Sequence, residues 1–227
     1  MTEPAPDDAS RQSSPQQHFG RALGARVDQV VDSASSLDGP ANVLKAAIAP
    51  VAGDQAPRGL RDALLGSWLG HPLHPIIVAL PIGAWSLTSV FDLLGEERAA
   101  DLCLRAGVVS AGGAALSGLA QWDTVTAHQR PRRIGLLHSS LNTVATGLYV
   151  GSWVLRSRGQ RGAGVATAVA GLATVSLSGW LGGHLSYTLG VGVEEDAFAR
   201  QAAESRPTVD EDADEAAPDQ SLDPLTG

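Results

Sequence analysis

The chain contains very little cysteine, few aromatic residues and no extended basic segment. The single Cys103 excludes an intrachain disulfide, a CxxC metal or redox pair and a CxxCH haem attachment. A net charge of −8 without a basic block argues against nucleic-acid binding as the main activity. G-x-S-x-G, P-loop and H-E-x-x-H motifs are also absent, so nothing supports a hydrolase or an NTPase.

The acidity lies at the two ends of the chain. Residues 194–227 contain 11 acidic residues against two Arg, whereas residues 60–193 carry a net charge of about +3. Residues 1–18 are rich in Pro, Asp, Ser and Gln, and residues 19–69 place apolar residues at helical spacing. We therefore predict a disordered arm at 1–18, short amphipathic or interfacial helices at 19–69 and an acidic disordered tail at 194–227.

Four apolar segments lie between these ends, at about residues 75–94, 102–121, 134–155 and 163–185. Each is close to the roughly 20 residues that a helix needs to cross about 30 Å of hydrocarbon. The third and fourth segments contain no charged residue, which is unusual for a helix of a soluble protein. Short polar connections between the segments predict an all-α, antiparallel four-helix transmembrane bundle at 70–193, with both tails on one side.

The expected location is the cell membrane, so the lipid bilayer is the first partner of this multi-pass protein. Arg residues are divided almost evenly between the two sides, and the positive-inside rule therefore gives little guidance. The long polar arm at 1–18 does not have the composition of a cleavable signal peptide. We therefore place the N- and C-termini in the cytoplasm.

Four histidines are expected to converge at the membrane boundary on the side of the tails: His71, His74, His138 and His184. They belong to the start of the first helix, the start of the third and the end of the fourth, which meet at one face of an antiparallel bundle. Asn142 lies one turn after His138 and could orient an imidazole or a bound group. At the opposite side, Asp92 and Arg105 fall at similar depth and are expected to form an ion pair.

The histidine cluster has two interpretations. In the first, facing imidazoles hold haem b, or a divalent metal, and the protein is a redox module that exchanges electrons with a quinone or a separate redox protein. In the second, the histidines bind helix ends and the protein is a non-enzymatic membrane scaffold or anchor. Whether the protein is an enzyme, and whether it forms a homo-oligomer, stay open at this point.

Three sequence motifs resemble one known family. They are Gly70-His71-Pro72-Leu73-His74-Pro75, Pro81-Ile82-Gly83-Ala84-Trp85, and Gly182-Gly183-His184-Leu185-Ser186-Tyr187 followed by Gly190-Val191-Gly192-Val193. The chain is similar in these motifs to "domain of unknown function 2231", and the resemblance covers about residues 65–193. It implies a small bacterial four-helix membrane protein, in some members joined to a Rieske-type iron–sulfur domain. The C-terminal tail lacks the Cys-His pairs that such a cluster requires.

Overall fold

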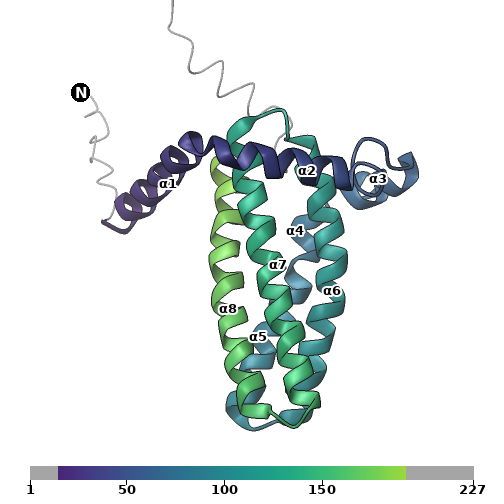
Figure 1. Cartoon of the computed structure of the whole chain (residues 1–227), viewed down its shortest axis with the longest axis vertical. Helices are drawn as coiled ribbons and strands as arrows, with labels where there is room; N and C mark the ends of the chain where they lie inside the picture. The colour runs from purple at the N-terminus through teal and green to yellow at the C-terminus, as the bar shows by residue number, and fades with distance from the viewer. Residues whose placement is uncertain (1–14, 193–227) are drawn as a thin grey trace, which may run out of the picture.

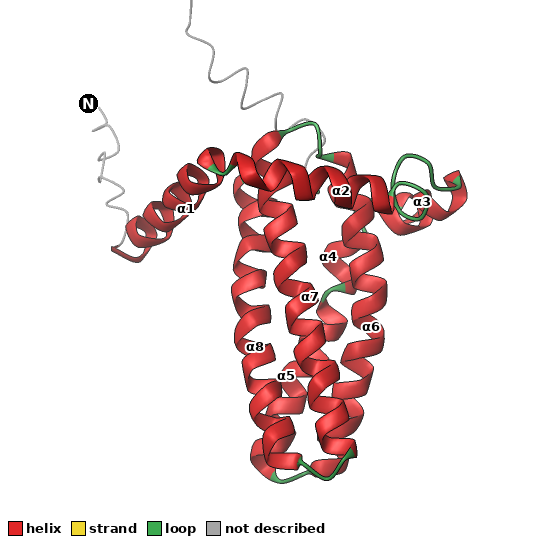
Figure 2. Cartoon of the chain, in the orientation of Figure 1, coloured by secondary structure: helices red, strands yellow, loops and turns green. Residues whose placement is uncertain are grey.

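The computed structural model describes residues 15–192, and every regular element in that range is helical (Figure 2). Three helices come first: α1 (Pro15–Ser33), α2 (Asp38–Ile48) and α3 (Arg58–Leu65). They lie across one end of the upright helices, and we call them the collar (Figure 1). Residues 15–18, predicted to be disordered, belong to α1. The rest of the predicted arm and the acidic tail lie outside the described residues.

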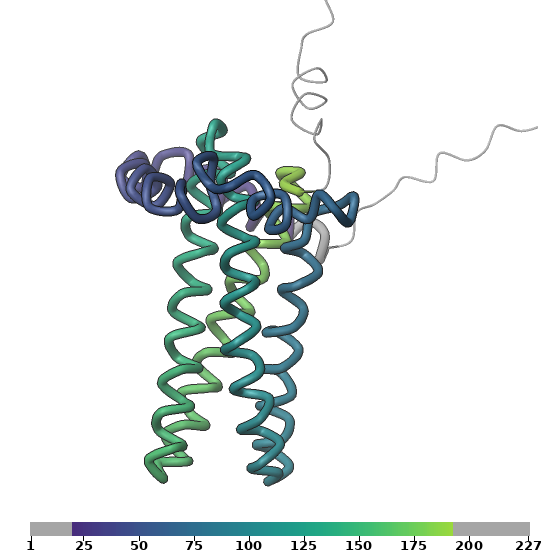
Figure 3. Tube along the Cα trace, turned by 90° about the vertical axis from the view of Figure 1, so that its right-hand side faces the viewer, coloured from purple at the N-terminus to yellow at the C-terminus, as the bar shows by residue number. Residues whose placement is uncertain are grey.

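The upright helices form two antiparallel hairpins that stand side by side below the collar (Figures 1 and 3). The first hairpin consists of α4 (His74–Ile77), α5 (Ala79–Leu94) and α6 (Glu97–Thr124). The second consists of α7 (Gln129–Ser157) and α8 (Arg161–Gly183), which continues as a π-helix, η3 (His184–Thr188). Contacts within each hairpin are much denser than contacts between the hairpins, so the interface between them is the looser part of the bundle.

Within residues 15–192, three segments are long and apolar enough to cross a membrane: His74–Leu94, Glu97–Thr124 and Arg161–Thr188. They match the first, second and fourth predicted spans. The helix of the third predicted span, α7, is of similar length but is not among them. Its middle contains His138, Asn142 and Thr143, and these polar side chains lower its hydropathy.

The two hairpins are copies of one sequence pattern with an offset of 64 residues. Residues 73–124 and residues 137–188 align without a gap and are identical at ten of 52 positions. The bounds of α6 are reproduced by Arg161–Thr188, 64 residues later. Both hairpins start at the collar end, so the repeat places a pseudo-two-fold axis along the length of the bundle.

The turns at the far end of the bundle confirm the repeat. Gly95 and Gly159 have φ angles of 75° and 76°, a left-handed conformation that favours glycine. In the next residues, the backbone N–H of Glu96 donates to the carbonyl of Phe91, and that of Gln160 donates to the carbonyl of Leu155, each at 2.9 Å. The same local sequence pattern therefore produces the same turn twice.

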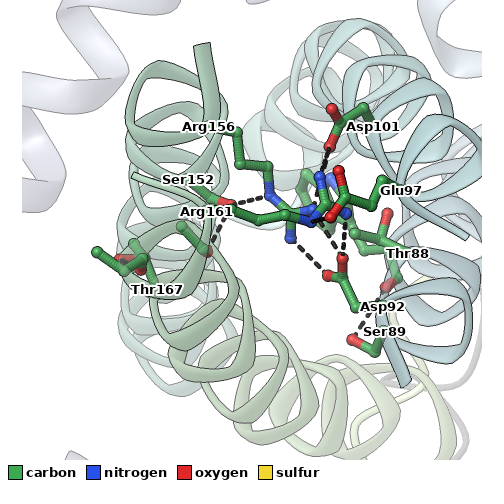
Figure 4. A network of polar contacts seen from close by, with 12 residues as sticks. Thr88, Ser89, Asp92, Glu97, Asp101, Ser152, Arg156, Arg161 and Thr167 are labelled. Carbon is green, nitrogen blue, oxygen red and sulfur yellow. Dashed lines mark hydrogen bonds and ion pairs between the residues drawn. The ribbon is translucent and has the colours of Figure 1, made fainter. Parts of the chain in front are cut away.

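An ion-pair network closes the far end of the bundle (Figure 4). The buried Asp92 of α5 accepts from Arg156 of α7 at 2.5 Å and from Arg161 of α8 at 3.0 Å. Asp92 and Arg156 occupy equivalent positions of the repeat, so opposite charges at one repeat position join the two hairpins. The predicted pair of Asp92 with Arg105 is wrong, because the Arg105 guanidinium lies over the ring of Trp153, 5.6 Å from its centroid.

Candidate functional site

A cavity of about 380 Å³ lies between the two hairpins in the half of the bundle nearer the collar. Its walls are mainly apolar side chains and glycines of α5, α6, α7 and α8, and Trp85 lies among them. Polar groups enter the cavity from His74, His138 and Asn142. A few polar groups in a largely apolar cavity of this size are typical of small-molecule and cofactor sites.

His74, at the start of α4, reaches from the first hairpin into this cavity. Its Nδ1 lies 3.0 Å from the carbonyl oxygen of Ala114 in α6. A carbonyl only accepts, so Nδ1 carries the proton and Nε2 keeps its lone pair. Within residues 15–192, Nε2 of His74 makes no hydrogen bond. Gly118 permits the close approach of the ring, since a Cβ there would lie 2.7 Å from Cε1 of His74.

His138 of α7 repeats this arrangement in the second hairpin. Its Nδ1 lies 2.8 Å from the carbonyl oxygen of Ser178 in α8, and a Cβ on Gly182 would lie 2.9 Å from its Cε1. These three residues follow His74, Ala114 and Gly118 by 64 positions. The repeat therefore places two imidazoles in one tautomer, at one depth, on helices that face each other diagonally. Their ring centroids lie 6.4 Å apart, with the planes at 90°.

The symmetry ends at Nε2 of the two rings. Nδ2 of Asn142 lies 3.0 Å from Nε2 of His138, one turn away on the same helix. The equivalent residue beside His74 is Val78, which has no side-chain donor. The two imidazoles therefore differ in the hydrogen-bond donor that lies next to Nε2.

The other two predicted histidines do not join this pair. Nε2 of His184 lies 2.9 Å from Oδ1 of Asp28 in the collar, and its ring stacks on Trp180 with the centroids 5.6 Å apart. His71 is exposed in the segment before α4, and neither residue lines the cavity. In the described part of the chain, no group of three or more His, Cys, Asp or Glu residues could hold a metal ion. The predicted four-histidine metal site is thus not assembled.

The collar is fastened to the bundle by the basic start of α7. Arg133 donates to both carboxylate oxygens of Asp38, at 2.8 and 2.7 Å, and caps the end of α1 through the carbonyls of Val31 and Asp32. Hydrogen bonding to Arg133 lowers the pKa of Asp38, and hydrogen bonding to Arg130 lowers the pKa of Asp32. These charge-assisted contacts hold α1 and α2 at the collar end of the cavity.

Sequence reasoning missed the residues that hold the two imidazoles. Ala114 and Ser178 act through backbone carbonyls, and Gly118 and Gly182 act by having no side chain, so none carries a chemical signature of its own. The signal that could have found them is the repeat, because aligning the sequence with itself at an offset of 64 pairs Ala114 with Ser178 and Gly118 with Gly182.

Among the comparisons with known proteins, one family model matches the chain. No curated protein and no solved structure matches the chain. A family model described as "Predicted membrane protein (DUF2231)" matches residues 70–195, which contain both hairpins, the cavity and the ion-pair network. The chain therefore belongs to the DUF2231 family of predicted membrane proteins, as its histidine and glycine motifs suggested.

Proposed function

We propose that this protein is a redox module in which four segments cross the cell membrane: α4 together with α5, then α6, α7 and α8. Haem b would bind in the cavity, between His74 and His138. The other two predicted histidines, His71 and His184, are not part of this site. The observation that carries the proposal is the pair of equivalent imidazoles on facing helices, 6.4 Å apart across an apolar cavity.

The spacing of the two rings suits a shared metal. Imidazole nitrogens bind first-row metals at about 2 Å, so two imidazoles on opposite sides of one metal have ring centres roughly 6 Å apart. The value of 6.4 Å between His74 and His138 is close to that requirement. Haem iron held by two imidazoles would supply one-electron transfer, with a quinone or a separate redox protein as the partner.

The hydrogen bonds behind the rings also support ligation. Histidines that bind metals usually donate their other ring N–H to a carbonyl or carboxylate, which fixes the tautomer and the ring orientation. Both His74 and His138 donate Nδ1–H to a backbone carbonyl of the neighbouring helix in their own hairpin. In this tautomer each Nε2 carries the lone pair that could bind a metal.

A non-enzymatic membrane scaffold is the second candidate. The same two Nδ1 bonds link helices within each hairpin, and Nε2 of His138 already accepts a hydrogen bond from Asn142. These contacts satisfy most of the polar atoms of the rings without a cofactor, as a structural role requires.

An absorption spectrum of the detergent-purified full chain, produced with an adequate haem supply, separates the two candidates. A redox module should show a stoichiometric Soret band. We expect His74→Ala to remove this band or His138→Ala to shift it. His71→Ala and His184→Ala are matched controls and should leave the band unchanged, because neither residue lines the cavity. A colourless wild-type protein, or a band equally sensitive to all four changes, would contradict the haem proposal and favour the scaffold.

A further inference from the structure

We infer that Asn142 would make His138 the displaceable one of the two ligating imidazoles and leave His74 as the fixed one, so that an incoming small ligand could take the place of His138. This inference rests on the proposed haem site and concerns what distinguishes its two sides.

The first step is competition for one lone pair. Nε2 of His138 accepts a hydrogen bond from Nδ2 of Asn142 at 3.0 Å. Because Nδ1 of the same ring is protonated toward Ser178, Nε2 is the nitrogen that a metal can bind. The amide hydrogen and a metal would therefore compete for this lone pair, and His138 could hold a metal only with the Asn142 side chain rotated away.

The second step is that His74 has no such competitor. Val78 occupies the place of Asn142 in the first hairpin, while the histidine, the carbonyl acceptor and the close glycine are retained. The two hairpins thus present the same imidazole geometry but differ in a hydrogen-bond donor next to one ligating atom. Binding through His74 requires no hydrogen bond to be broken.

The third step is access from outside the bundle. Ser139 and Thr143 line the cavity next to Asn142, and Thr143 is exposed on the outer surface of α7. Two hydroxyl groups therefore lie beside Asn142 on the His138 side of the cavity, and the amide would be free to donate to a bound ligand once Asn142 has rotated. The His138 side of the cavity therefore suits a small uncharged ligand of haem iron that can accept a hydrogen bond from the Asn142 amide.

The test uses the full chain loaded with haem b and measures the spin state, haem retention and carbon monoxide binding to the reduced form. His74→Ala should lose haem, whereas His138→Ala should keep it with an altered spin state. Asn142→Val copies the first hairpin and should slow carbon monoxide binding about fivefold, the effect of one net hydrogen bond. Val78→Asn is the matched control, and it should lower haem retention by introducing the same competition at His74.

The possible failures are distinguishable. If wild-type protein binds haem but Asn142→Val changes neither spin state nor carbon monoxide binding, the role of Asn142 is overturned and the proposed function stands. Equal loss of haem in His74→Ala and His138→Ala also overturns the inference alone. If wild-type protein binds no haem, the proposed function and the inference are both overturned.

Discussion

Trp85 and Tyr149 stack face to face between the two hairpins, with ring centroids 4.1 Å apart and planes within 7° of parallel. They occupy the same position of the 64-residue repeat, so the pseudo-two-fold axis passes between their rings. Each ring also packs on a glycine of the helix beside it in its own hairpin, Gly107 for Trp85 and Gly171 for Tyr149. The same pairing of an aromatic side chain with a glycine therefore occurs once in each hairpin, and the two aromatic rings meet at the centre of the bundle.

Substitution of Gly107 should test this packing. A Cβ there would overlap the indole of Trp85, which is buried and cannot move aside without disturbing Tyr149. Gly107→Ala should therefore lower stability in detergent by about 1–3 kcal/mol, the usual cost of overpacking. Gly112→Ala is the control on the same helix, since a Cβ there meets nothing within 4 Å. Equal melting temperatures for the two variants would contradict the packing described.

The ion-pair network predicts a large effect at the far end of the bundle. Arg156→Met removes one of the two arginine partners of Asp92 and one of the two of Asp101, and leaves Arg161 alone to neutralise both. We expect a loss of about 3 kcal/mol, as for other buried pairs deprived of one member. Arg158→Met changes an exposed arginine just beyond the end of α7 and should stay within about 0.5 kcal/mol of wild type. Thermal unfolding of both variants in one detergent compares them directly.

Attachment of the collar should weaken in acid. The pKa values of Asp32 and Asp38 are lowered in the folded protein by hydrogen bonds from Arg130 and Arg133. A lowered pKa means that the stabilisation is complete at neutral pH and is lost as the pH falls from about 3.8 through the folded-state values. Hydrogen exchange of residues 20–48 should therefore accelerate below about pH 4 relative to that of α6.

The Asp38→Asn variant supplies the check on this acid effect. It removes the charge that Arg133 binds, so exchange of α1 and α2 should already be faster at pH 7 and should respond less to acid. Asp54→Asn changes an exposed carboxylate between α2 and α3 and should behave like wild type. An acid response retained in full by Asp38→Asn would show that another group controls the collar.

The crossing of the membrane by α7 can be tested by labelling single cysteines in a Cys103→Ser background. Ala127 and Gln160 are exposed residues beyond the two ends of α7. If α7 spans the bilayer, an impermeant thiol reagent should reach Ala127→Cys and Gln160→Cys from opposite sides of sealed vesicles. Labelling of both from one side would mean that α7 does not cross, and the proposed topology would be wrong.

Part of the candidate site was predictable from the sequence. His74, His138 and Asn142 were expected together, and all three line the cavity. His184 was expected with them but turns to Asp28 of the collar, and His71 lies in the exposed segment before α4. Successive residues of a helix point about 100° apart, so shared depth alone does not show which side chains face each other.

The sequence by itself determined the family and three of the four predicted apolar spans, because hydropathy depends on a few neighbouring residues. Only the tertiary structure decided which side chains of different helices contact each other. It paired Asp92 with Arg156 and Arg161, fastened the collar to α7, and aligned His74 with His138 across the pseudo-two-fold axis. Those contacts depend on how each helix is rotated about its own axis, and that rotation is fixed by the packing of all the helices at once.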